Sequence, residues 1–179
     1  MGSAGTAYIW SMRAAFAGVA VFTLLVHLLP LETQPRGWVA PDVLLALTLA
    51  WTMRRPDIVP VALVAVVFLL ADFLLQRPPG LFTGLVVVAS EVARYRHDDI
   101  RETLFLFEWL TAAALMVGVY LAYLIVLGIV SPTPISASLV VLQGVFTILA
   151  YPLVVGLSQS IFGIRIAAPG EVDERGRRL

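Results

Sequence analysis

Two short connections between apolar segments constrain the fold of this chain most strongly. Between residues 42 and 96, three apolar segments are separated only by Arg54-Arg55-Pro56-Asp57 and by Gln76-Arg77-Pro78-Pro79-Gly80. Connections of about four or five residues bring consecutive helices into antiparallel contact. We therefore expect a triple helical hairpin here, with one helix before it and two after it.

The composition predicts that these helices lie in a membrane. Hydrophobic residues make up 60% of the 179 residues and charged residues only 13%, whereas soluble domains have roughly 45–50% and about 25%. Such a chain has too little polar surface to cover itself in water, which indicates an integral membrane protein. It has no cysteine, so disulfides and cysteine-based catalysis or metal binding are excluded.

The apolar runs predict an all-α bundle of six transmembrane helices. They cover about residues 14–31, 38–53, 58–75, 81–93, 104–130 and 135–162. The first lacks a small-x-small cleavage site, so we expect an uncleaved helix rather than a signal peptide. The fourth gives only about 20 Å and needs shelter from its flanks or neighbours. Pro152 should kink the last helix unless a neighbour satisfies the carbonyl it frees.

The arginines predict the orientation of this bundle. All 12 basic residues are arginines, and a cytoplasmic N-terminus places ten of them on the cytoplasmic side, with only Arg36 and Arg77 outside. This distribution follows the positive-inside rule. We expect residues 1–164 to form one transmembrane domain and residues 165–179 a disordered tail, with both termini in the cytoplasm.

Ionisable residues in apolar segments are the candidates for function, because a charge is costly in lipid. They are His27, Asp42, Asp72, Glu91 and Glu108. Glu91 can pair with Arg94 one helical turn later. Glu108 and His27 lie near helix ends, where we expect each of them to reach either the lipid headgroups or an arginine.

Asp72 is the only acid in its helix, and two interpretations stay open. It is either an interfacial acid or part of a helix–helix or partner contact near the outer face. In the second case Arg77 is a candidate ion-pair partner.

No catalytic or metal-binding constellation emerges from the sequence. The two histidines, His27 and His97, are expected on opposite membrane faces and cannot share a metal. His97 with Asp98 and Asp99 could chelate a hard cation, but a solvated charged loop is the expected interpretation. We therefore predict no catalytic residue, no cofactor and no metal.

Three segments carry a resemblance to a known family. They are Pro41-Asp42-Val-Leu-Leu-Ala-Leu-Thr-Leu-Ala-Trp51, the Arg54-Arg55-Pro56 turn, and Phe68-Leu-Leu-Ala-Asp72-Phe-Leu-Leu-Gln-Arg-Pro-Pro-Gly80. Over residues 38–96 the chain resembles MreD, the bacterial rod-shape-determining membrane protein. The fold implied by this resemblance is similar to the six-helix substrate-binding subunits of energy-coupling-factor transporters.

The resemblance implies a non-enzymatic scaffold of the cell-elongation machinery in the bacterial inner membrane. Such a scaffold binds MreC, acts indirectly with MreB, RodA and a class B penicillin-binding transpeptidase, and helps organise peptidoglycan synthesis and rod shape. The positions expected to bind a partner are Asp42, Asp72, Arg77, Pro78, Pro79 and Gly80. The family assigns them no catalytic role.

Two other functions remain as alternatives. A solute-binding membrane subunit of a transporter would have a polar pocket opening outward between the first, third and sixth helices, containing His27, Asp72 or Gln143. An intramembrane enzyme would need at least two convergent catalytic groups, and the sequence offers no such pair.

Overall fold

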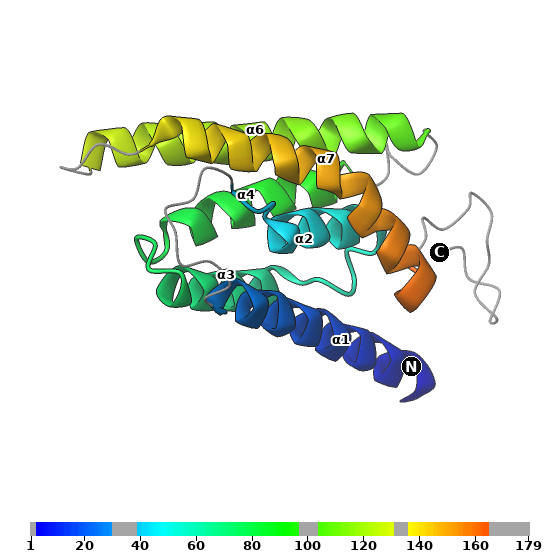
Figure 1. The fold of residues 1–179 in the computed structure, drawn as a ribbon. Helices are drawn as coiled ribbons and strands as arrows, with labels where there is room; N and C mark the ends of the chain where they lie inside the picture. Colours follow the sequence, from blue (N-terminus) through cyan, green and yellow to red (C-terminus); the bar gives the residue numbers. More distant parts are fainter. Residues whose placement is uncertain (1–2, 30–38, 97–103, 131–135, 165–179) are drawn as a thin grey trace.

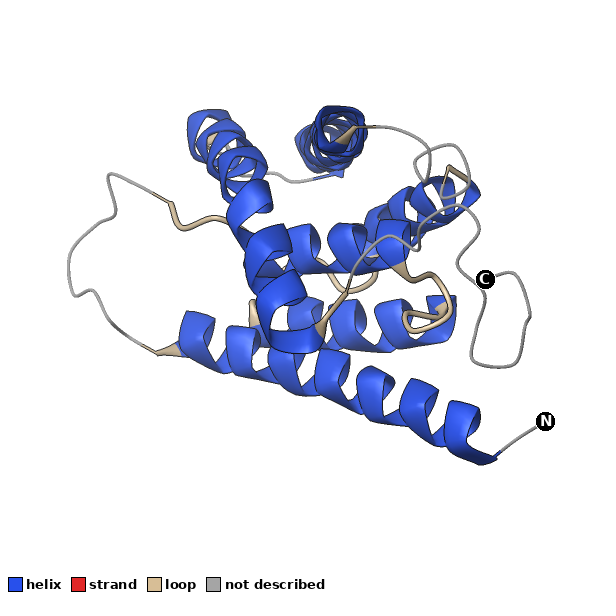
Figure 2. Cartoon of the chain, turned by 90° about the vertical axis from the view of Figure 1, so that its right-hand side faces the viewer, coloured by secondary structure: helices blue, strands red, loops and turns tan. Residues whose placement is uncertain are grey.

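The computed structural model describes residues 3–29, 39–96, 104–130 and 136–164, and within these the chain forms helices and no strand. The helices are α1 (Ser3–Leu28), α2 (Val43–Arg54), α3 (Val61–Leu74), α4 (Leu81–Tyr95), α6 (Phe105–Val130) and α7 (Ala137–Phe162). They lie in three layers, with α6 and α7 on one face, α2 and α4 in the middle, and α1 and α3 on the other face (Figures 1 and 2).

Membrane character rests on three long helices. Within the described residues, α1, α6 and α7 contain apolar stretches long enough to cross a membrane, at Thr6–Leu28, Phe105–Val130 and Ala137–Phe162. The other helices have 12, 14 and 15 residues, or about 18–23 Å at 1.5 Å per residue. The all-helical class is thus confirmed, while three of the six expected spans are shorter than a bilayer.

The first helix differs from its expected bounds, because α1 begins at Ser3 rather than at residue 14. Arg13 marked the edge of the apolar run, but arginine is a good helix former and does not end a helix. The expected tail at residues 165–179 lies outside the described residues.

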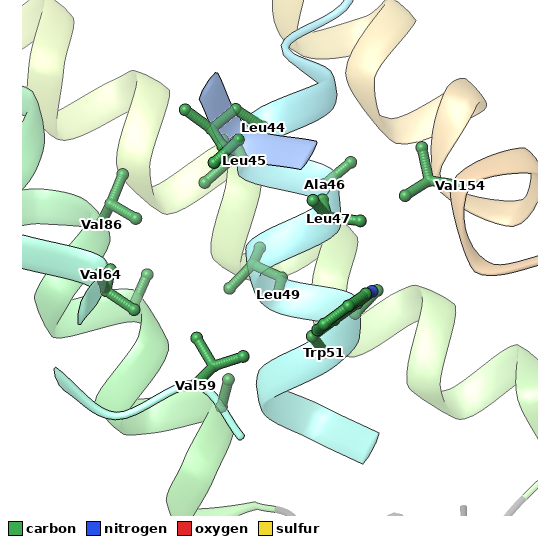
Figure 3. Close-up of a cluster of buried hydrophobic side chains, with 14 of the residues drawn as sticks. Leu44, Leu45, Ala46, Leu47, Leu49, Trp51, Val59, Val64, Val86 and Val154 are labelled. Atoms are coloured by element: carbon green, nitrogen blue, oxygen red, sulfur yellow. The ribbon is translucent and has the colours of Figure 1, made fainter. Parts of the chain in front are cut away.

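Helix α2 forms the centre of the molecule. Every residue from Leu44 to Arg54 is buried, and α7, α4, α6 and α1 surround the helix. Figure 3 shows α2 side chains meeting Val86 from α4 and Val154 from α7. A helix this short can lie within a membrane protein because its neighbours, and not lipid, cover it on all sides.

Trp51 packs against aromatic rings in this core, and its indole N–H also has a hydrogen-bond partner. Its ring lies between those of Phe16 and Phe162, with centroids 5.5 and 5.2 Å away. Its indole N–H donates to Ser158 Oγ at 3.0 Å. The tryptophan therefore links α1, α2 and α7 without leaving its buried N–H unpaired.

The triple hairpin forms only in part. Helices α3 and α4 pack closely, as expected, but α2 packs most closely against α7 and α4 rather than α3. Arg94 of α4 explains the difference, since it donates to the backbone oxygens of Pro56 and Val59 at 2.7 and 2.8 Å. These bonds hold residues 55–60 against α4, so that this connection leads from the middle layer into the outer one.

Helix α7 changes direction in its second half, where Pro152 lies (Figure 1), although a kink was expected only if no neighbour satisfied the freed carbonyl. Proline lacks the N–H that would bond to the carbonyl four residues earlier. The indole N–H of Trp109 donates to that carbonyl, on Ile148, at 2.9 Å. Helix α6 thus satisfies the group that the proline frees.

The helices alternate in direction, so that the start of α1 and the end of α7 lie at one end of the bundle (Figure 1). We call this the near end. The opposite end, which contains the connection at residues 75–80, is the far end.

The far-end connection contains a strained residue, and this generates a first prediction. Gln76 has a left-handed backbone with φ 55°, which costs a side-chain-bearing residue roughly 1 kcal/mol or more. Gln76→Gly should therefore raise the free energy of unfolding by about 1 kcal/mol in detergent. Gly80→Ala, at φ 86° in the same connection, is the matched control and should lower it. An unchanged or lower midpoint for Gln76→Gly would contradict this assignment.

Candidate functional site

Asp72 caps the start of α4 from a neighbouring helix. Its Oδ2 accepts hydrogen bonds from Gly80 N at 3.0 Å, Thr83 N at 3.2 Å and Thr83 Oγ1 at 2.8 Å. The first amides of a helix have no acceptor within the helix, and Gly80, which precedes α4, has no side chain to supply one. The fully buried Asp72 performs the work of an N-cap and places a negative charge at the positive end of the helix dipole.

Asp72 makes a helix–helix contact, but Arg77, the candidate ion-pair partner, does not pair with it. Arg77 instead approaches Asp42, with 3.6 Å between Nη2 and Oδ2, and its guanidinium lies 4.4 Å from the centre of the Phe82 ring. Only its main chain reaches Asp72, through a bond from Arg77 N to the Asp72 carbonyl at 2.9 Å. Three donors from α4 direct the Asp72 carboxylate toward that helix and away from the arginine.

Asp42 ties three parts of the far end together. As the N-cap of α2, it accepts a bond from Leu45 N on Oδ1 at 3.0 Å. Its own N–H donates to Thr147 Oγ1 of α7 at 2.9 Å, while its second oxygen faces Arg77. Helix α2 therefore begins at Val43, with Asp42 as its N-cap, and not at about residue 38 as the apolar run predicted.

The six residues expected to bind a partner thus share the far end but have different exposures. Asp42 and Asp72 are buried, Arg77 is partly buried, and Pro78, Pro79 and Gly80 are exposed. The two acids are therefore placed to position the connection at residues 75–80, and the two prolines lie on its exposed side.

The polar pocket expected for a solute-binding subunit has a small counterpart here. A cavity of about 10 Å³ at the far end is lined by Thr23, His27, Asp42 and Arg77 together with five apolar residues. This is room for about one water molecule, whereas small-molecule sites typically occupy about 300–1,000 Å³. Gln143 lies elsewhere, where it donates to the Ala40 carbonyl at 3.4 Å.

The near end holds a buried ion pair that the sequence reasoning missed. Arg54 donates from Nε and Nη2 to both carboxylate oxygens of Glu108 at 2.8 Å, and the two side chains are only 3% and 1% exposed. The Tyr151 hydroxyl donates to the same carboxylate at 2.9 Å, and Arg54 Nη1 donates to the Ile164 carbonyl at 3.4 Å. Glu108 is therefore an internal group joining α2, α6 and α7, and of its two expected partners, lipid headgroups or an arginine, it has the arginine.

A signal for this pair was present in the sequence. Arg54 ends one apolar run and Glu108 begins another, and both were expected at the same membrane face. Opposite charges at the same predicted depth are candidates for pairing. The sequence alone did not show that the two helices are neighbours.

A second, more exposed ion pair lies on α4 at the near end. Glu91 and Arg94 are joined at 2.9 Å between Oε1 and Nε, as their spacing predicted. Residues 97–99, with the candidate cation ligands His97, Asp98 and Asp99, lie outside the described residues. Among the residues that are described, no group of three His, Asp or Glu side chains could hold a metal ion.

Together the fold and the site define a class of protein, namely a helical protein whose described segments include three helices long and apolar enough to cross a membrane. Comparison of the chain with protein-family models, with characterised proteins and with solved structures gives no match. Function therefore has to be argued from the residues and their geometry.

The buried ion pair predicts a strong asymmetry between two glutamates. Glu108→Ala leaves the Arg54 cation buried without its partner, so we expect a loss of about 3–5 kcal/mol in the free energy of unfolding. Glu91→Ala removes an exposed pair and should cost no more than about 0.5 kcal/mol. Thermal and denaturant unfolding in detergent would measure both, and equal losses would refute the structural role of Glu108.

The cap on α4 predicts a local effect. Asp72→Ala removes the acceptor of three hydrogen bonds and should lower stability by about 1–3 kcal/mol. Hydrogen exchange should accelerate at the amides of Gly80 and Thr83, because these two lose that acceptor. Asp57→Ala, which removes an exposed carboxylate, is the control. Unchanged exchange at Gly80 and Thr83 in the Asp72 variant would show that the cap is dispensable.

Proposed function

We propose that this protein is a non-enzymatic membrane scaffold of the bacterial cell-elongation machinery, similar to MreD. It lies in the inner membrane with six membrane-embedded helices and both termini in the cytoplasm. The observation that carries the proposal is the convergence of the MreD-like positions on the far end. There Asp42, Asp72 and Arg77 surround an exposed connection that ends in Pro78-Pro79-Gly80.

The far-end connection is suited to binding a partner because it is held rigidly. The two prolines have fixed φ angles, Asp72 fixes the start of the following helix, and Arg77 is held between Asp42 and Phe82. A surface that is already ordered loses little conformational entropy on binding. With the near end in the cytoplasm, the far end faces the periplasm, where the scaffold MreC would meet it.

The outer faces of the bundle support a role in the membrane. Large apolar side chains are exposed on α1, α3, α4, α6 and α7, among them Phe22, Phe73, Val88, Ile125 and Leu153. Lipid and the transmembrane helix of MreC would cover these surfaces. MreB, RodA and the class B penicillin-binding transpeptidase would then be organised through the assembled complex.

Co-purification with an MreC-like single-span partner tests this function. Pro79→Glu should reduce recovery of the partner at least about fivefold, the change produced by losing roughly 1 kcal/mol of binding free energy. Val130→Glu, which alters an exposed position at the far end of α6, is the control and should leave recovery unchanged.

Two results would count against the proposal. Recovery with Pro79→Glu equal to that of the unaltered protein would remove the far-end connection as the partner site. If deletion of the gene left a rod-shaped cell unchanged, with no second gene of the same type to compensate, the elongation role itself would be wrong.

A further inference from the structure

A basic and aromatic patch lies at the near end, away from the far-end site. It consists of Tyr8, Trp10 and Arg13 of α1 with Arg55 and Asp57 of the following connection, and we call it the basic-aromatic patch. Arg13 Nη2 donates to the Asp57 carbonyl at 3.0 Å. The guanidinium of Arg13 lies 5.3 Å from the centre of the Trp10 ring, and that of Arg55 lies 5.9 Å from the centre of the Tyr8 ring.

The charges of the patch do not cancel. Arg55 donates to both carboxylate oxygens of Asp57, at 3.3 and 3.2 Å. Burial by itself lowers the pKa of the Arg55 guanidinium, but its interactions with Asp57 and Tyr8 outweigh this and raise the pKa. Arg55 is therefore a permanent cation that neutralises Asp57.

Arg13 supplies the excess positive charge. Among the described residues it contacts only neutral groups, the Asp57 carbonyl and the Trp10 ring, and its buried Nε–H has no acceptor there. Buried N–H groups in folded proteins almost always have a partner. The other arginines nearby, Arg54 and Arg94, are each paired with a glutamate. Arg13 is thus a cation without a counter-charge in the described part of the chain.

The aromatic residues of the patch indicate the depth at which it lies. Trp10 is 63% exposed and Tyr8 46% exposed, although both are large rings with an apolar body. Exposed tryptophan and tyrosine side chains of membrane proteins are enriched at the level of the lipid headgroups. The forked guanidinium of arginine matches two oxygens of a phosphate group, and basic sites between helices on the cytoplasmic side bind anionic headgroups.

We propose that the basic-aromatic patch binds the phosphate group of an anionic phospholipid in the inner leaflet. Arg13 makes the charged contact, and the Trp10 ring packs against the glycerol and upper acyl region of the same lipid. Because Arg55 pairs with the Asp57 carboxylate and neutralises its charge, that acid does not repel the phosphate. The inference rests on the membrane orientation in the proposed function and is independent of the partner site at the far end.

Native mass spectrometry of the full chain in a neutral detergent tests the proposal. Titration with phosphatidylglycerol should give bound lipid at concentrations where phosphatidylcholine gives much less. Arg13→Gln should weaken phosphatidylglycerol binding about fivefold, and Arg13→Lys, which keeps the charge but loses the fork, should lie between. Arg96→Gln removes an exposed arginine from the end of α4 and should leave binding unchanged.

Three outcomes would overturn the lipid site. The first is equal phosphatidylglycerol binding by the unaltered protein and Arg13→Gln, and the second is a loss of binding in Arg96→Gln as large as that in Arg13→Gln. The third is displacement of the lipid by excess inorganic phosphate, which would indicate a site for the free anion. Thermal unfolding of the variants shows whether they fold. Recovery of the MreC-like partner should be unaffected by Arg13→Gln, so failure of the lipid site and failure of the scaffold function give different results.

Discussion

The structure depends on the burial of one short helix whose two ends carry charges. Helix α2 is covered on all sides, yet it is preceded by Asp42 and ends at Arg54, both of which are buried. A buried charge is tolerated only when it is paired and hydrogen-bonded. Each end is therefore bonded to residues far away in the chain. Arg77 and Thr147 contact Asp42, and Glu108 and the Ile164 carbonyl accept hydrogen bonds from Arg54. These contacts fix α2 along its axis, while apolar packing fixes it sideways.

The same requirement recurs wherever a backbone group lacks a local partner. Within a membrane no water is available to complete a helix end or a broken ladder. Asp72 of α3 completes the start of α4, Trp109 of α6 bonds to the carbonyl freed by Pro152, and Arg94 of α4 holds the connection at residues 55–60. Each of these bonds joins two elements of the chain. Hydrogen bonds from side chains to backbone groups therefore position the helices relative to one another.

This use of polar groups bears on function. The acids of the apolar segments are the first candidates for intramembrane chemistry. Three of them, Asp42, Asp72 and Glu108, are bonded to groups inside the fold. The molecule presents apolar helix faces, a rigid proline turn at the far end and the basic-aromatic patch at the near end. Surfaces of these kinds fit the proposed scaffold, which contacts lipid and partner proteins rather than converting a substrate.

The sequence by itself determined the helical, apolar class of the protein and the approximate place of each helix, but not the residues at which α1, α2 and α3 begin. Apolar runs interrupted by arginine and proline set the helices, and the spacing of Glu91 and Arg94 set their ion pair, because both depend on residues close together in the chain. The partners of Arg54, Arg77 and Asp72 were decided only by the tertiary structure. Asp72 and Arg77 are five positions apart, so they were candidates for pairing. Three donors at the start of α4 bind the Asp72 carboxylate instead.

Glu108 is far from Arg54 in the chain, and only the packing of α6 against α2 brings them together. Pairing of buried charges depends on which helices become neighbours. Hydrophobicity is nearly uniform around all the described helices except α4, so it does not specify that order.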